Sequence, residues 1–193
     1  MSDSNDSGIR NLITCLDEAV RLRDTQAITQ HIKTKIGTLC TCHEFSLPGS
    51  YTECSGISYA RRLLHHDPEL NYTVVVMTWG PGQGTGLHDH AGMWCVECVV
   101  EGEVDVTQYD LREEQDGQCR FARSQQIKTG IGDAGCLIPP YDYHVLSNAN
   151  TDRKAVTLHV YGGEMDHCNV YEPAEDGWWK RRARSLSYDN QRY

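Results

Sequence analysis

Residues 79–90 read WGPGQGTGLHDH, a glycine-rich stretch that leads into His88, Asp89 and His90. On a β-strand, residues i and i+2 face the same side. Both imidazoles are therefore expected to point into the fold, while Asp89 points out. Two imidazoles on one face can ligate a metal ion, but a single His-x-His pair is weak support because histidine pairs also occur by chance.

Short β-rich runs surround this stretch and are separated by glycine and proline. They cover residues 72–79, 94–100, 104–109, 135–138, 143–146 and 155–161. Many short strands bounded by turns, with no helical pattern between them, are typical of a sandwich or barrel of antiparallel strands. The sequence therefore predicts a mainly β fold.

The N-terminal part has a different periodicity. Between Ile9 and about Lys35, apolar residues recur near the helical period with charged residues between them. This pattern predicts two amphipathic helices that pack on one face of the sheet. The chain of 193 residues fits one domain, divided into a helical cover (1–47), a β-barrel (48–176) and a C-terminal tail (177–193).

The tail holds a basic cluster. It consists of Lys180, Arg181, Arg182 and Arg184. Because the whole chain has a formal charge of -9, we expect a solvent-exposed strap that pairs with carboxylates, not a phosphate-binding or nuclear-targeting segment.

Composition excludes several classes of function. Lys and Arg number 18 against 27 for Asp and Glu, so a nucleic acid would be repelled over most of the surface. The start has no signal-peptide pattern, and 18 apolar residues never run together, so a cytoplasmic protein without a membrane span is expected. The nine cysteines are scattered, without the two paired CxxC units of a zinc site, and are expected to be mostly reduced thiols.

The histidine pair lies in a longer pattern that resembles the first motif of the cupin superfamily. Gly82 is followed after five residues by His88, then by His90, after four more by Cys95, and after six more by Gly102. The match has one departure, since Cys95 stands where a glutamate is usual.

A second pattern is similar to the other cupin motif. Pro139 precedes His144, and Asn148 follows four residues later, although Tyr141 replaces the usual glycine. Two motifs in the right order within a β-rich chain imply a cupin, a small β-barrel with the N-terminal helices packed on it. The metal ion would be bound through His88, His90 and His144.

The ligand set narrows the choice of metal. Three neutral imidazoles suit Zn, Cu, Fe or Ni, and they leave the full charge of a divalent ion in place. Such a site favours an anionic substrate, including a thiolate. Dioxygen can react at redox-active Fe(II) but not at Zn(II), so Fe(II) is the predicted cofactor.

Residues 59–172 resemble the thiol dioxygenase family, which includes cysteine dioxygenases and bacterial 3-mercaptopropionate dioxygenases. The most specific matches are WGPGQGTGLHDH, the cysteine at position 95, PPYDYH at 139–144 and TLHVY at 157–161. The resemblance implies iron on the same three histidines and a thioether between Cys95 and Tyr161. It also implies a hydrogen-bonded relay of Thr157, His159 and Tyr161, which would share one face of a strand.

Cysteine dioxygenases have an arginine that receives the substrate carboxylate, and two candidates occur here. They are Arg61, which keeps the Tyr-x-Arg pattern, and Arg62, which needs no insertion before Tyr72. Arg61 is preferred, and a guanidinium can bind a carboxylate through two parallel hydrogen bonds. Cys168 is a further expected substrate-binding residue.

The substrate itself is left open by mixed features. Gly86 and the Gly162-Gly163 pair favour the bacterial mercapto-acid enzymes, whereas Cys95, the early arginine and Cys168 favour the cysteine-oxidising type. The expected reaction converts a small thiol and O2 to a sulfinate. L-Cysteine is the favoured substrate, with 3-mercaptopropionate or mercaptosuccinate as alternatives.

Two other interpretations stay in view. In the first, Glu97 completes a His-His-Glu-His site for a carbon substrate or an isomerisation, although its spacing from His90 is longer than usual. In the second, the protein is a non-catalytic metal-binding cupin that senses a small acid. The oligomeric state is not predicted.

Overall fold

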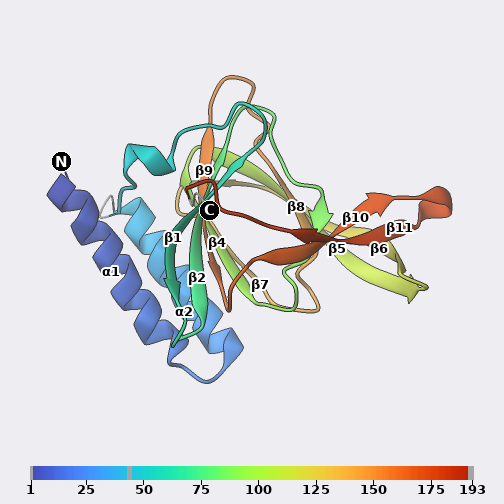
Figure 1. Ribbon diagram of the computed structural model, residues 1–193, viewed down its shortest axis with the longest axis horizontal. Helices are drawn as coiled ribbons and strands as arrows, with labels where there is room; N and C mark the ends of the chain where they lie inside the picture. Colours follow the sequence, from blue (N-terminus) through green and yellow to red (C-terminus); the bar gives the residue numbers. More distant parts are fainter. Residues whose placement is uncertain (1, 43–44, 191–193) are drawn as a thin grey trace.

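Two α-helices, two 3-10 turns (Gly49–Tyr51 and Glu175–Gly177) and eleven strands make up the secondary structure of the described residues in the computed structural model (Figure 1). It describes residues 2–42 and 45–190, and the side chains from Ser7 onward. The predicted helical cover and tail also include residues 1, 43–44 and 191–193, which lie outside the described residues.

The helices are α1 (Ser2–Val20) and α2 (Thr25–Thr41), and they pack together on one side of the molecule (Figure 1). Leu12 and Leu16 lie one turn apart and are both buried. The Asp24 side chain accepts a hydrogen bond of 2.8 Å from the Ala27 backbone N–H, which satisfies one free donor at the start of α2. The prediction of two N-terminal helices that pack on a sheet is confirmed.

The first sheet has five antiparallel strands in the order β1-β2-β9-β4-β7. Their bounds are β1 (Ala60–Asp67), β2 (Tyr72–Trp79), β9 (Ala155–Tyr161), β4 (Cys95–Glu101) and β7 (Ala134–Leu137). β2 and β9 are buried along their whole length and have the bounds that the sequence predicts. Burial on both faces explains why they read as continuous apolar runs.

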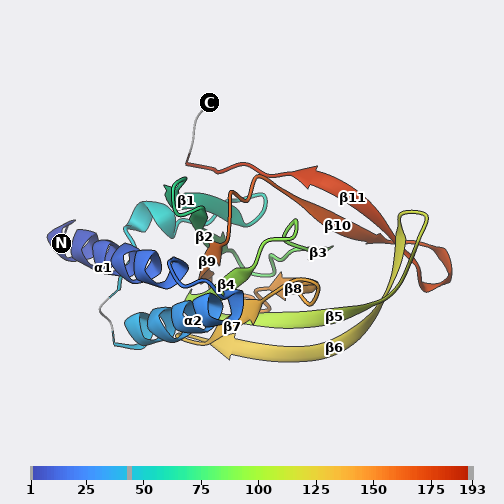
Figure 2. The same cartoon turned by 90° about the horizontal axis from the view of Figure 1, so that it is seen from below.

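The second set of strands closes into a ring, in the order β10-β11-β6-β5-β8-β3. The bounds are β10 (His167–Pro173), β11 (Trp179–Ser185), β6 (Gln118–Gly130), β5 (Glu103–Gln115), β8 (His144–Ser147) and β3 (Leu87–His88). The β5/β6 and β10/β11 hairpins extend together away from the helices (Figure 2). The predicted fold class, a mainly β barrel of the cupin type, is confirmed.

The β5/β6 hairpin is much longer than the sequence predicts, since each strand has 13 residues. Its turn is Asp116-Gly117, where φ is 51° and 75°. Two positive φ values in succession define the hairpin turn that an Asp-Gly pair favours. Both strands are largely polar toward the turn, so the hydrophobic alternation that reveals a strand is missing there.

The predicted tail is also different in the structure, because residues 179–185 form β11. This strand pairs with β10 along its whole length and with β6 at Trp179 and Lys180. The barrel therefore does not end at residue 176. Most side chains of β11 are exposed, so the segment is rich in charged residues. It lacks the alternation of apolar and polar residues that would have predicted a strand.

Gly102 shows why the first cupin motif ends in glycine. It forms the tight turn between β4 and β5 with a φ of 75°, and a Cβ added there would lie 2.6 Å from the Lys154 carbonyl oxygen. Only glycine satisfies both requirements without strain. None of the helices within residues 2–42 and 45–190 is long and apolar enough to cross a membrane.

Candidate metal centre

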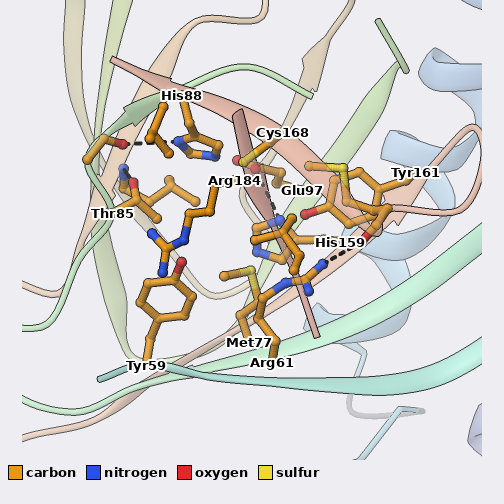
Figure 3. A pocket seen from close by; sticks show the side chains of 15 residues that line it. Tyr59, Arg61, Met77, Thr85, His88, Glu97, His159, Tyr161, Cys168 and Arg184 are labelled. Atoms are coloured by element: carbon orange, nitrogen blue, oxygen red, sulfur yellow. Dashed lines mark hydrogen bonds and ion pairs between the residues drawn. The ribbon is translucent and has the colours of Figure 1, made fainter. Parts of the chain in front are cut away.

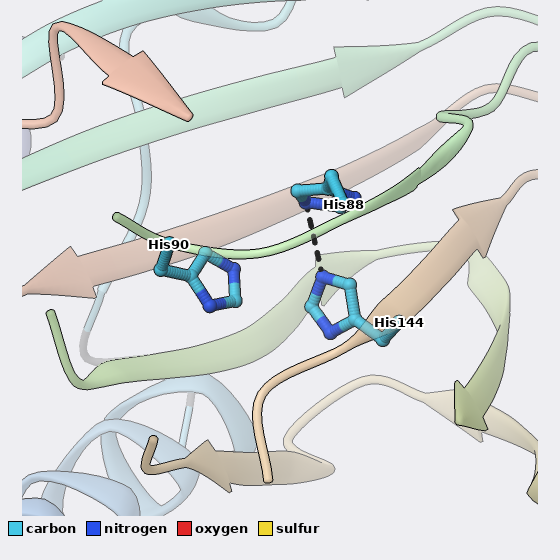
Figure 4. Close-up of side chains that lie close together, drawn as sticks. All are labelled: His88, His90 and His144. Carbon is cyan, nitrogen blue, oxygen red and sulfur yellow. Dashed lines mark hydrogen bonds between the residues drawn. The ribbon is translucent and has the colours of Figure 1, made fainter. Parts of the chain in front are cut away.

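The three motif histidines converge inside the barrel (Figure 4). His88 ends β3 and lies directly opposite His144, the first residue of β8, while His90 follows β3. The Nε2 atoms of His88 and His144 are 3.2 Å apart. One ring nitrogen from each of the three lies within 4.8 Å of the others, so the three side chains can share one ion.

The other ring nitrogens are oriented by nearby oxygens. His88 Nδ1 lies 3.1 Å from the Gly86 carbonyl oxygen, and His90 Nδ1 lies 3.5 Å from Oδ2 of Asp142. The same carboxylate accepts a 3.0 Å hydrogen bond from the His90 backbone N–H. A ligand histidine usually donates its second N–H to an oxygen, which fixes the ring and leaves Nε2 for the metal. His88 Nδ1 can donate to Gly86 in this way, whereas the side chain of His90 makes no hydrogen bond to Asp142 and only its backbone N–H does.

The donor set fits a divalent transition metal. Both ring nitrogens of His90 and Nδ1 of His144 are buried without a hydrogen-bond partner among the described residues, an arrangement that is costly unless an ion or ligand satisfies it. Burial lowers the pKa of His88 to about 4, and it holds the pKa of His144 well below its usual range. Both rings are therefore neutral near pH 7 and can donate lone pairs.

Asp89 points away from the three histidines, as the strand alternation predicts, but it does not face solvent. Its carboxylate accepts hydrogen bonds from the Asn169 backbone and side chain, at 2.9 and 2.8 Å, and from the Tyr171 hydroxyl at 2.9 Å. Both partners are on β10, which pairs with β3. Asp89 thus holds the histidine-bearing segment against the neighbouring strand.

A small cavity that is partly open to solvent lies beside His88 (Figure 3). Apolar side chains, among them Met77, Leu146 and Met165, form part of its wall. The charged side chains that line it are Arg61, Glu97 and Arg184.

The two candidate arginines of β1 point in opposite directions. Arg61 is 6% exposed and lines the cavity, where its guanidinium donates to the carbonyl oxygens of Ser187 (3.0 Å) and Met165 (3.1 Å). Arg62 donates to the Tyr51 and Glu53 carbonyl oxygens, outside the cavity. Successive residues of a strand face opposite sides, so only the first of the pair can reach a ligand there.

A third arginine reaches the cavity from the segment that was predicted to be a solvated strap. Arg184, on β11, is exposed but lines the cavity wall (Figure 3). The expected pairing with carboxylates is confirmed for Arg181, 2.8 Å from Glu114, and for Arg182, 2.6 Å from Glu172. No sequence pattern indicates that one residue of this cluster faces inward.

Cys95 and Tyr161 lie directly opposite each other on β4 and β9, and both are buried. Side chains at directly opposed positions of two antiparallel strands are neighbours. Burial raises the pKa of both groups well above their ordinary values. The two residues that the resemblance joins by a thioether are therefore adjacent and protonated before any cross-link forms.

The expected relay is present in part. Thr157 Oγ1 lies 2.7 Å from His159 Nε2 and accepts a 2.9 Å hydrogen bond from Trp79 Nε1. His159 and Tyr161 are stacked with ring centroids 6.0 Å apart, and no hydrogen bond joins their described side chains. A stacked arrangement brings ring faces together, which leaves the in-plane nitrogens of the imidazole to other partners.

Glu97 lies beside the remaining imidazole nitrogen of His159, without a hydrogen bond between them. Its Oε1 lies 3.0 Å from His159 Nδ1 and 3.5 Å from His144 Nε2, and its side chain is 11% exposed. Burial would raise the pKa of Glu97, but the imidazoles of His144 and His159 outweigh it and hold that pKa well below its usual range. A carboxylate therefore faces the cavity between the candidate metal ligands and the predicted relay.

Fold and site together define a cupin barrel with a three-histidine candidate metal centre. A sequence profile of the family cysteine dioxygenase type I matches residues 50–174, and the chain belongs to this family. Cysteine dioxygenase type 1 of Rattus norvegicus is 20% identical over 122 residues, which cover 63% of this chain and 60% of that protein. The corresponding Homo sapiens protein is 22% identical over 130 residues, with the same coverage. The chain thus spans about three fifths of the length of these relatives.

Solved structures with some similarity are more distant. A protein from Thermus thermophilus aligns with a TM-score of 0.45 and 20% identity, over 61% of this chain and 94% of its own. A cupin superfamily protein from Desulfitobacterium hafniense aligns with a TM-score of 0.45 and 14% identity, over 61% and 90%. Alignments at this level carry no information about function.

Sequence reasoning named the histidines, Cys95 and Tyr161, and it named Glu97 only as a possible metal ligand. It missed Asp142, the approach of Glu97 to His159 and the inward position of Arg184. Asp142 lies inside the PPYDYH match, two residues before His144, and could have been found as the oxygen that orients a ligand. Glu97 shares the inward parity of Cys95 on β4, and this periodicity was a usable signal. Arg184 had none, because only strand pairing directs it inward.

Proposed function

We propose that this protein is a non-haem Fe(II) thiol dioxygenase that oxidises a small thiol carboxylic acid, with L-cysteine as the main substrate, to the sulfinate. The observation that carries the proposal is that one cavity is lined by a candidate metal ligand (His88), a phenol (Tyr161) and a buried guanidinium (Arg61). The reaction RSH + O2 → RSO2H is balanced as written, because both oxygen atoms go to sulfur. It needs no further reductant.

The histidines would hold Fe(II), which, when bound, supplies a redox-active Lewis acid for thiol and dioxygen chemistry. The protein contributes orientation. Arg61 can receive the substrate carboxylate, since carbonyl oxygens of the described residues use only two of the five N–H donors of its guanidinium. Those two bonds also fix the guanidinium, so little conformational freedom is lost on binding.

Tyr161 would act as a hydrogen-bond donor at the reacting sulfur or oxygen. Its hydroxyl is buried, and burial keeps its pKa well above the ordinary value, so the proton stays on the phenol near pH 7. His159, which is hydrogen-bonded to Thr157, stacks on the Tyr161 ring and would fix its position. Cys168, also on the wall of the cavity, would contact the substrate from β10.

The proposal is tested by oxygen consumption of the iron-loaded protein with L-cysteine, 3-mercaptopropionate and mercaptosuccinate. A sulfinate that carries two labelled atoms from isotopic dioxygen is the expected product with L-cysteine. The same protein loaded with Zn(II) is the matched control and should consume no oxygen. Binding of these acids without oxygen consumption would contradict the proposal and favour a non-catalytic sensor, and a strong preference for a mercapto acid would correct the substrate.

A further inference from the structure

A second cavity lies in the protein besides the one next to His88 (the first cavity). The strands that line it are β4, β7 and β9 of the five-stranded sheet and β5, β6 and β8 of the ring. Its aliphatic side chains are Val99, Val104, Val106, Ile127, Leu137 and Leu146. Ile127 is 38% exposed, whereas Leu137 and Leu146 are buried. The second cavity therefore runs from the surface near Ile127 into the interior.

The inner end of the second cavity lies close to the candidate metal centre. Glu97 and Leu146 line both cavities and so form the wall between them. Glu97 Oε1 is 3.5 Å from His144 Nε2. Gln108, which also lines the second cavity, pairs directly with His144 between β5 and β8. These few side chains separate the second cavity from a candidate metal ligand.

The two cavities differ in the charged groups that line them. Arg61 and Arg184 line only the first cavity. Among the described residues, the charged side chains of the second cavity are Glu97 and Asp133, and no basic side chain lines it. An anionic thiol acid therefore finds a positive partner in the first cavity and none in the second. The second cavity suits an uncharged molecule better.

The two hydroxyl groups that line the second cavity are already engaged. Thr129 donates a 3.0 Å hydrogen bond to the Val104 carbonyl oxygen. Thr157 accepts one from Trp79 and lies 2.7 Å from His159 Nε2. A ligand that needs several hydrogen bonds would lose its water there without equivalent partners, whereas an apolar molecule would not. Apolar cavities in proteins take up small apolar solutes such as xenon.

We propose that the second cavity is the route by which dioxygen reaches the metal centre, separate from the cavity that takes the thiol acid. The inference rests on the proposed thiol oxidation and adds to it the entry path of the second reactant. Dioxygen is a small apolar molecule, so its transfer from water to an aliphatic wall is favourable. Leu146 is the aliphatic part of the shared wall, and a change of its rotamer opens a passage for a diatomic molecule. A thiol bound in the first cavity then does not block the entry of dioxygen.

Two substitutions narrow the second cavity at different depths. Val106→Phe adds an aromatic ring at the position directly opposite Leu146. Gly135→Leu adds a side chain at an exposed position of the wall, where a new Cβ would have nothing within 4 Å. Each should lower kcat/KM for O2 at saturating L-cysteine about 3- to 10-fold. The anaerobic dissociation constant of L-cysteine, from calorimetry, should stay unchanged.

Gly130→Leu is the matched control for Gly135→Leu. Gly130 ends β6 and lines neither the first nor the second cavity. A Cβ added there also has nothing within 4 Å, and neither glycine has a positive φ. The same change of side chain outside the second cavity should leave kcat/KM for O2 as in the wild type.

Xenon tests the second cavity without turnover. Crystals of the wild-type protein under xenon pressure should bind the gas among Val99, Val106 and Leu146, because xenon occupies apolar cavities. Val106→Phe should abolish this binding, and Gly130→Leu should keep it. Iron content and thermal unfolding are measured for each variant, since an added ring can overpack a core.

Three results would overturn the inference. They are the absence of xenon from the second cavity, an unchanged kcat/KM for O2 in both narrowed variants, and weaker binding of L-cysteine in them, which would show that the thiol uses this cavity. If Val106→Phe does not fold, Gly135→Leu and xenon binding by the wild type still decide. If no thiol is oxidised, the proposed function fails by itself. Xenon in the second cavity would then still support a route for an apolar gas, and its absence would exclude one.

Discussion

The two faces of the first sheet differ sharply, although they alternate along the same strands. Toward the helices, β9 presents Val156, Leu158 and Val160, which are fully buried in one apolar cluster. Toward the barrel, the intervening positions are Thr157 and His159, polar side chains that are equally buried. One strand therefore supplies a conventional core on one side and the chemistry of the site on the other.

The difference between the faces shows how buried polar groups are tolerated here. On the inner face, the Thr157 side chain is held by Trp79 and His159. Burying such groups without partners would be unfavourable, whereas the apolar outer face is stabilised by its area removed from water. The apolar side chains of the outer face thus stabilise the sheet, and the sheet holds the polar side chains of the inner face in place.

Among the substitutions considered, loss of a metal ligand should reduce activity the most. We expect His88→Ala, His90→Ala and His144→Ala each to abolish tight Fe(II) binding and activity, because two neutral imidazoles hold Fe(II) poorly. Metal analysis after gel filtration measures this. Full iron occupancy in all three variants would show that the inner face does not hold the ion through these residues.

The next effect is expected at the carboxylate-binding arginine. Arg61→Ala should lower kcat/KM for L-cysteine and 3-mercaptopropionate about 30- to 1000-fold, because a charge-assisted bidentate contact is lost. Cysteamine, which has no carboxylate, should hardly change. Steady-state oxygen uptake is the measurement, with thermal unfolding to check that the C-terminal segment bound by Arg61 stays ordered.

Arg62→Ala is the control for this prediction, because it removes the adjacent arginine on the opposite side of β1. Arg184→Ala should have a smaller effect than Arg61→Ala, since an exposed guanidinium forms weaker ion pairs. A larger loss with Arg184 would assign the carboxylate to β11 instead.

Adjacent substitutions on β9 compare the two faces directly. Leu158→Ala should lower the free energy of unfolding by about 2–5 kcal/mol through the cavity it leaves. Thr157→Val keeps the volume but leaves Trp79 and His159 without a partner, at a cost of about 1–3 kcal/mol. Urea denaturation measures both. We expect activity per folded molecule to fall only in Thr157→Val, and equal loss in Leu158→Ala would contradict the separation of the faces.

The smallest expected effect is a change in mass at the cross-strand pair of Cys95 on β4 and Tyr161 on β9. If Cys95 and Tyr161 are joined by a thioether, mass spectrometry should find a fraction of the protein two hydrogens lighter, with the loss confined to one cross-linked peptide pair. Cys95→Ser should remove this fraction, while Cys98→Ser, a substitution on the helix side of the same strand, should keep it. A cross-link that persists without Cys95 would identify another thiol.

Local sequence was sufficient to predict a strand where one or both of its faces are buried. The bounds of β2 and β9 could be predicted from their apolar runs, and the parity of Thr157 and His159 followed from the period of two. The long β5/β6 hairpin and β11 could not be predicted in this way, because their side chains are mostly exposed and their pairing depends on backbone hydrogen bonds.

The sequence by itself indicated the family and the barrel, because motif spacing and strand period are local properties. The metal-binding role of the three histidines and the thioether between Cys95 and Tyr161, which the resemblance implies, stay predictions. Tertiary structure alone decided which charged groups surround the cavity. Arg61 faces it and Arg62 does not, Arg184 enters it through the pairing of β11 with β10, and Glu97 meets His159 across the β4/β9 register. Such contacts join residues far apart in the chain, and register between strands, which no local pattern encodes, brings them together.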